Sequence, residues 1–148
     1  MAKTGDIQKL RELTGAGVMA SKKALDDAVG DFDKAVALIK ERGFAKAAEK
    51  AGRETKAGLV KAYVHNDRVG ALLELNCETD FVAHSDPFRE LAHNLAMQIV
   101  AMNPKDVKEL LAQPYIRDEG MTINDLVKGV ILKTGENIKV GRFTRYEL

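Results

Sequence analysis

The spacing of apolar residues predicts three short helices in the first third of the chain. Residues 7–14 place their large apolar side chains on one helical face, and two further runs repeat at the same period. We expect the first helix to end at Gly15 and Gly17, the second at Gly30 and the third at Gly43. Asp31 is expected to cap the third helix. The apolar positions of the three helices are Ile7, Leu10 and Leu13, then Val18, Leu25 and Val29, then Phe32, Ala35, Val36 and Ile39.

The pattern changes to a period of two after a stretch rich in alanine and charge at 44–57, which we interpret as a partly helical linker. In Leu59–His65 alternate residues share a face, Asn66 and Asp67 form a turn, and Val69–Cys77 returns as a second strand. Alternation along that second strand predicts one buried face, made of Val69, Ala71, Leu73, Leu75 and Cys77.

The last third mixes helices with one strand. Asp86 is expected to cap a long helix that has Pro87 at its first position and a stripe of Phe88, Leu91, Leu95, Ile99 and Met102. One or two helical turns follow at 107–111, and Thr122 is expected to cap a helix that ends near Gly135. Residues 138–146 form a third strand, in which the apolar phase slips at Gly141 and indicates a bulge.

These elements predict an α+β fold in two parts. A three-helix N-terminal domain occupies residues 1–44, a linker follows at 45–57, and residues 58–148 form an α+β core domain. The core domain is expected to contain a three-stranded antiparallel sheet with helices packed on one side.

Composition narrows the class of protein. The 148 residues carry a formal net charge of +1, with 45% hydrophobic and 30% charged residues, as in soluble globular proteins. No apolar run approaches the roughly 20 residues that cross a bilayer, and no secretory signal is evident, so we expect a cytoplasmic protein without a membrane partner. The single cysteine fits a reducing compartment. A net charge near zero argues against a protein that mainly grips nucleic-acid phosphates.

The residues that could carry chemistry do not combine into a catalytic site. Residues 15–20 match a dinucleotide fingerprint, but a helix rather than a strand precedes them. The three histidines lack metal-ligand spacing, and Cys77 falls on a buried strand face, where a structural thiol is expected. We therefore predict no enzyme activity, no cofactor and no bound metal.

The stretch Asn76–Val82 is the most unusual in the chain. It lies between a strand and a helix, where polar residues and glycine are usual, yet it places Phe81 and Val82 beside Glu78 and Asp80. Such an apolar side chain either packs back into the core or is offered to a partner. Taken alone, the stretch favours Phe81 as a staple beneath the next helix.

Two segments closely resemble the signatures of bacterial elongation factor Ts. Leu10–Met19 with Lys22–Leu25 is similar to the N-terminal signature, and Asn76–Ala83 to the second signature. Gln113–Tyr115 and Gly135–Ile138 match pieces that recur in the C-terminal part of that family. The resemblance is ordered and spans nearly the whole chain. It implies a ubiquitin-associated-like N-domain and a guanine-nucleotide exchange factor for elongation factor Tu, the GTPase that delivers aminoacyl-tRNA.

The resemblance also implies binding residues. Thr79, Asp80, Phe81 and Val82 match the family segment that inserts beside the nucleotide site of the GTPase and helps to dislodge Mg²⁺. In the N-domain, which docks on the GTPase in the family, the candidate contacts are Leu13, Gly15, Gly17, Val18 and Met19.

This chain departs from the family in two ways. Many members are longer, with a second core subdomain and a coiled-coil insertion, and short members can replace the missing half by homodimerisation, so we predict a homodimer. Gly141 stands where family tails usually carry a basic residue.

Two other functions stay open at this point: a three-helix interaction module, and a nucleic-acid binder that uses basic residues near Lys22 and Lys23.

Overall fold

Three helices form the first of two units in the computed structural model, which describes residues 2–148. They are α1 (Thr4–Thr14), α2 (Val18–Asp27) and α3 (Phe32–Glu49). Their core is buried and built from small and aliphatic residues: Leu10, Ala24, Leu25, Ala28 and Ala35. The side chain of Asp31 accepts a hydrogen bond from the Lys34 N–H at 3.1 Å, which confirms the predicted cap of α3.

Two predictions for these helices are wrong. The third helix does not end at Gly43 but continues to Glu49, because one glycine within a helix costs only about 1 kcal/mol relative to alanine. Val29 is not on the apolar face of α2. It follows the end of that helix with φ at 54° and is 92% exposed, so it contributes nothing to the core.

The second unit, Glu49–Leu148, contains the predicted three-stranded antiparallel sheet. The strands are β1 (Ala57–His65), β2 (Val69–Cys77) and β5 (Ile138–Glu147), in the order β1-β2-β5. Asn66 and Asp67 both have positive φ in the turn between β1 and β2, as tight hairpins require. The pairing register shifts by one residue opposite Glu74, which confirms the bulge predicted at Gly141.

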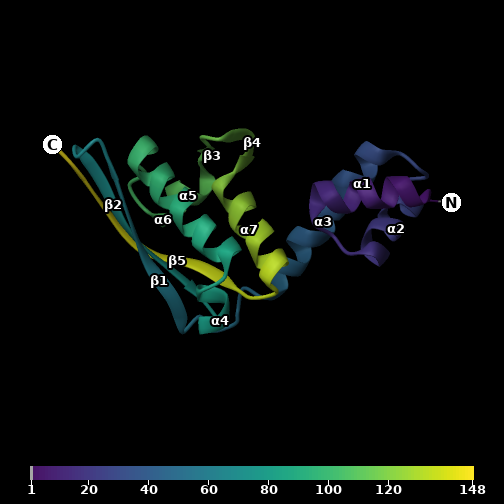
Figure 1. Cartoon of the computed structure of the whole chain (residues 1–148), viewed down its shortest axis with the longest axis horizontal. Coiled ribbons are helices and arrows are strands. Elements are labelled where there is room, and N and C mark those ends of the chain that lie inside the picture. The colour runs from purple at the N-terminus through teal and green to yellow at the C-terminus, as the bar shows by residue number, and fades with distance from the viewer. Residues whose placement is uncertain (1) are drawn as a thin grey trace. The chain divides into compact units, whose positions relative to one another are not determined.

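Helices cover one face of this sheet, and Figure 1 shows α5 lying along it. They are α4 (Asp80–Ala83), α5 (Asp86–Met102), α6 (Val107–Ala112) and α7 (Ile123–Thr134). The predicted inward residues of β2 from Ala71 to Cys77 are buried, as are Phe88, Leu91, Leu95 and Ile99 of α5. Thr122 forms a capping box with Asp125, which confirms the predicted start of α7.

Three details of the second unit differ from the prediction. Ser85, not Asp86, is the N-cap of α5, and its hydroxyl donates to the Val82 carbonyl instead of capping the helix. Met102, at the end of the stripe, is exposed. A second sheet of two short strands, β3 (Pro114–Tyr115) and β4 (Asp118–Thr122), was not predicted, since so few residues show no periodicity.

Candidate functional site

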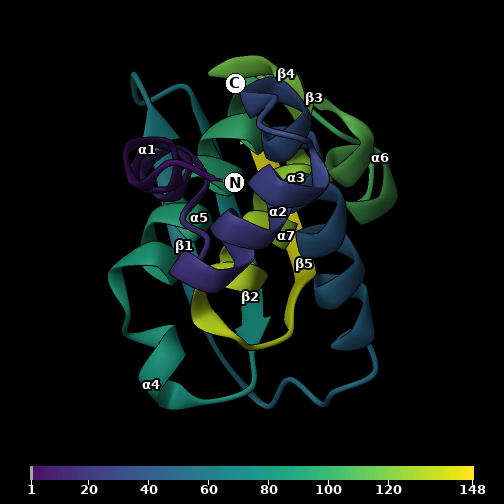
Figure 2. The same ribbon diagram turned by 90° about the vertical axis from the view of Figure 1, so that its right-hand side faces the viewer.

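The strand-to-helix stretch forms a single helical turn, α4, directly after β2 (Figure 2). Thr79 is its N-cap: the side-chain oxygen accepts a hydrogen bond from the Val82 N–H at 3.3 Å. At the other end, the Ser85 hydroxyl donates to the Val82 carbonyl at 2.6 Å. A four-residue helix is not stable alone, so these side-chain hydrogen bonds fix its position at the end of the sheet.

Phe81 projects from this turn into solvent. Its side chain is 86% exposed, whereas its neighbour Val82 is 5% exposed and belongs to the core. The interpretation of Phe81 as a staple under the next helix is therefore wrong: that anchoring place is taken by Val82. A large aromatic group held in solvent on a fixed turn is typical of a residue that binds a partner.

Asp80 lies at the first position of the turn and is exposed. Within residues 2–148 its carboxylate has no hydrogen-bond or ion-pair partner, while its backbone carbonyl interacts with His84 Nδ1 at 2.7 Å. The charged group of Asp80 is thus available beside Phe81. Asp80 and Phe81 thus present one acidic and one aromatic group, whereas the hydroxyl of the exposed Thr79 is already hydrogen-bonded within the protein.

A second segment that the sequence reasoning missed supports this turn. Glu136 lies between α7 and β5, and one of its carboxylate oxygens accepts the N–H groups of Glu78 at 3.1 Å and Thr79 at 3.0 Å. The other oxygen accepts the Thr79 hydroxyl at 2.7 Å. The only sequence signal for this role was the match of Gly135–Ile138 to a recurring family piece, which says nothing of a contact with Thr79.

Cys77 lies beneath the same turn and is buried, as predicted. Its thiol donates to the Thr79 carbonyl at 3.2 Å. Burial raises the pKa of the Cys77 thiol above its ordinary value, and the negative charge of Glu136 raises that pKa further. A neutral thiol of this kind is a poor nucleophile, which agrees with a structural role.

The predicted contacts in the first unit lie around the turn between α1 and α2. Leu13, Val18 and Met19 are all exposed although they are large and apolar. Gly15 ends α1 with φ at 73°, a conformation that favours glycine, while Gly17 has an ordinary φ of −71° and open space around its Cα. The motif that resembled a dinucleotide fingerprint is therefore a helix-to-helix turn with an apolar surface.

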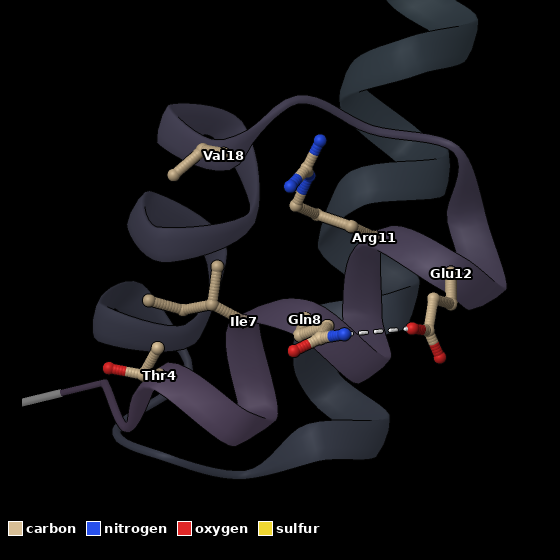
Figure 3. Close-up of a pocket in the computed structure, with 6 residues that line it drawn as sticks. All are labelled: Thr4, Ile7, Gln8, Arg11, Glu12 and Val18. Atoms are coloured by element: carbon tan, nitrogen blue, oxygen red, sulfur yellow. Dashed lines mark hydrogen bonds between the residues drawn. The ribbon is translucent and has the colours of Figure 1, made fainter.

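An open hollow lies beside this turn, and Figure 3 shows the side chains around it. Ile7 and Arg11 reach it from α1, and Val18 from α2. Gln8 donates to Glu12 at 3.2 Å along the same helix. Arg11 places a positive charge next to the apolar patch, a feature that the sequence reasoning did not single out.

The described part of the chain contains no group of three or more histidine, cysteine or acidic residues arranged to hold a metal ion. None of the helices in residues 2–148 is long and apolar enough to span a membrane. Exposed apolar groups on a fixed turn and on a helical turn are, by contrast, the features of a protein that binds other proteins.

Comparison with known proteins agrees with this class. A family model described as Elongation factor TS matches residues 78–148, which include α4 and Glu136. Elongation factor Ts proteins of Thermotoga neapolitana and Thermotoga maritima are each 45% identical to the chain, over 96% of it and 94% of the relative. The protein of that name from Fervidobacterium nodosum is 42% identical over 96% of the chain and 95% of the relative.

The chain therefore belongs to the elongation factor Ts family, a family of non-catalytic translation factors. The alignment with the Thermotoga proteins extends over 186 positions, whereas this chain has 148 residues. The relatives accordingly contain segments that have no counterpart here.

Proposed function

We propose that the protein binds elongation factor Tu in its GDP form and promotes release of GDP, by displacing Mg²⁺ and stabilising the nucleotide-free state. Family membership supports the partner, and the exposure of Phe81 on a capped turn is the observation that carries the mechanism. The protein needs no catalytic group for this. By linkage, a factor that prefers the nucleotide-free GTPase weakens GDP binding by the same ratio.

In this proposal Phe81 enters between elements of the GTPase and holds them in the nucleotide-free arrangement. Asp80 engages polar groups that this shift exposes, and Thr79 and the buried Val82 keep the turn in place. Mg²⁺ is a large local charge that bridges the phosphates and the protein, so its loss weakens the hold on GDP.

The first unit supplies a second contact with the GTPase. Leu13, Val18 and Met19 form an apolar patch around the glycines of the turn between α1 and α2, and Arg11 adds a positive charge beside it. Two separate contacts let the protein bind firmly through one while the other disturbs the nucleotide site. An isolated three-helix interaction module, in contrast, would have no use for the turn that carries Phe81.

The test is the release of a fluorescent GDP analogue from elongation factor Tu in the presence of Mg²⁺. We expect strong acceleration by the protein and the loss of most, but not all, of it in Phe81→Ala, with the fold intact. Undiminished acceleration by a folded Phe81→Ala variant would contradict the mechanism. A folded wild-type protein without any effect on release would contradict the function itself.

We further propose that the protein works in the cytoplasm as a homodimer, without direct contact with nucleic acid. Support comes from the outer face of the three-stranded sheet, opposite α5, where Val60, Val64, Leu72 and Tyr146 are all exposed. Four large apolar groups on one sheet face are costly in water, and a second copy would cover them. Light scattering should give twice the mass of the chain, and Leu72→Lys should convert the dimer to a monomer.

A further inference from the structure

A segment near the C-terminal end of the chain contacts the turn that carries Phe81. Glu136 lies 57 residues beyond Thr79 in the sequence and Asn137 lies 59 residues beyond Glu78, yet both contact the residues that begin the turn. Glu136 uses both carboxylate oxygens, one for two backbone N–H groups and one for the Thr79 hydroxyl. Hydrogen bonds to an ionised carboxylate are about twice as strong as neutral ones.

The contact is reciprocal. While Glu136 accepts from the backbone of Glu78 and Thr79, the Glu78 carboxylate accepts the Asn137 N–H at 2.6 Å. The Glu78 carboxylate also forms an ion pair with Arg53, whose guanidinium lies 3.6 Å away. Two chain segments are thereby held together by four hydrogen bonds that the two carboxylates accept.

The same cluster fixes the residues that precede β1. The Asn137 side-chain amide donates to the carbonyl of Arg53 at 2.8 Å and to that of Ala51 at 3.4 Å. Asn137 is 2% exposed, so these bonds form away from water, where leaving the amide unpaired would be costly. The segment after α3, the end of β2 and the start of β5 thus meet in one polar cluster.

The position of Glu136 relative to the cap has a specific consequence. The Thr79 hydroxyl donates to Glu136 and accepts from the Val82 N–H, so the carboxylate determines where the hydroxyl proton points and leaves a lone pair for the cap. Without Glu136 the hydroxyl can rotate, and the N–H groups of Glu78 and Thr79 lose their acceptor. The turn would keep the anchor of the buried Val82 and the bond from Ser85, but it would lose the contacts that fix Thr79, so Phe81 would be held less firmly.

We infer that Glu136 is a positioning residue for nucleotide exchange, which acts on the GTPase only through Phe81 by holding the Thr79 cap. This inference rests on the proposed function. The physical reason is preorganisation: a mobile aromatic side chain and its turn lose conformational entropy when they insert into a partner, and a turn that is already fixed avoids that loss.

The test is a double-mutant cycle on the release of a fluorescent GDP analogue from elongation factor Tu, using the full chain. Glu136→Ala should slow the maximal accelerated rate about tenfold, because charge-assisted hydrogen bonds are lost. The concentration that gives half of the maximal rate should change less than about twofold, since the patch on the first unit is untouched. Glu119→Ala, which removes an exposed carboxylate of β4, is the matched control and should leave the rate unchanged.

The decisive comparison is Glu136→Ala added to Phe81→Ala. If Glu136 acts through Phe81, the double variant is no slower than Phe81→Ala alone. Effects that multiply would overturn the inference, as would a folded Glu136→Ala variant with the wild-type rate. Absence of acceleration by the wild-type protein is a different result, which overturns the proposed function.

Glu136→Gln keeps the inference testable if Glu136→Ala does not fold. Glutamine retains one acceptor oxygen for the two backbone N–H groups but loses the charge and the second acceptor. We expect a rate between those of the wild type and Glu136→Ala, and the same lack of an added effect in the Phe81→Ala background. A Glu136→Gln effect that multiplies with that of Phe81→Ala would count against the positioning role.

Discussion

Phe81 and Val82 are adjacent in one helical turn, but Phe81 is 86% exposed and Val82 is 5% exposed. The turn thus divides two apolar side chains between solvent and core. Val82 anchors the turn with its side chain and with its N–H, which donates to the Thr79 hydroxyl. Phe81 is the larger of the two residues but contributes little to the core. Substitutions can therefore test the roles of Phe81 and Val82 separately.

Phe81→Ala is expected to abolish most of the exchange activity and to change the free energy of unfolding by less than about 0.5 kcal/mol, because an exposed side chain adds little to stability. Val82→Ala should instead cost about 1–3 kcal/mol of stability, since it leaves a cavity in the core. Urea unfolding and the release of labelled GDP measure the two effects. Equal destabilisation by both substitutions would contradict the division.

The glycines of the turn between α1 and α2 should respond differently to alanine. Gly17→Ala meets no atom within 4 Å and has an ordinary φ, so the fold should be unchanged, while binding of nucleotide-free elongation factor Tu should weaken if the partner approaches this backbone closely. Gly15→Ala forces φ of 73° on a residue with a Cβ and should cost about 1 kcal/mol in stability. Titration of binding and thermal unfolding distinguish the two. Unchanged binding by Gly17→Ala would exclude the close approach.

Gly58 in β1 is required by its neighbour in β2. A Cβ at this position would lie 2.2 Å from the Leu75 carbonyl oxygen, and φ is 153°. Because the obstacle is backbone, Gly58→Ala should destabilise the protein by roughly 2–3 kcal/mol or more. Gly129→Ala is the control: it lies exposed within α7 with nothing near a Cβ and should add about 1 kcal/mol of stability. If the denaturant midpoints of Gly58→Ala and Gly129→Ala moved in the same direction, the close contact between Gly58 and Leu75 would not be what requires glycine at position 58.

Val29 is a β-branched residue in a left-handed conformation, with φ at 54°, and it makes no core contact. Val29→Asn should therefore stabilise the protein by about 1 kcal/mol, because asparagine adopts this conformation at lower cost. The same change at the exposed helical position Ala37 should destabilise it by about 0.5 kcal/mol. Thermal unfolding of both variants checks the sign. A loss of stability in Val29→Asn would mean that the exposed valine is not strained.

The buried thiol of Cys77 predicts a pH dependence. Its pKa in the folded protein is raised by burial, so the unfolded chain releases this proton at lower pH than the folded one. The stabilisation is complete below the ordinary thiol pKa and is lost as the pH rises through the raised value. The unfolding free energy of the wild type should thus fall relative to that of Cys77→Ala at alkaline pH. A difference between the two proteins that does not vary with pH would contradict this prediction.

The elements whose stability is local could be predicted from the sequence. Strand β2 alternates over nine residues and α5 repeats its apolar residues over several turns, so both were predicted with their buried faces. The bulge at Gly141 was visible as a slip in the same alternation. Short elements such as β3 contain too few residues to show a periodic pattern. Helix α3 continues through Gly43, because the helical residues on either side outweigh the cost of one glycine.

Whether Phe81 packs inward or faces solvent was decided by the tertiary structure. Residues 76–83 contain two apolar side chains next to each other, and the local sequence does not say which one enters the core. In the folded chain Val82 enters the core, and Thr79, which caps the turn, is bound by Glu136 from 57 residues away, beside the paired strands β2 and β5. Local periodicity determines which elements form, whereas contacts between distant segments fix the orientation of a single exposed side chain.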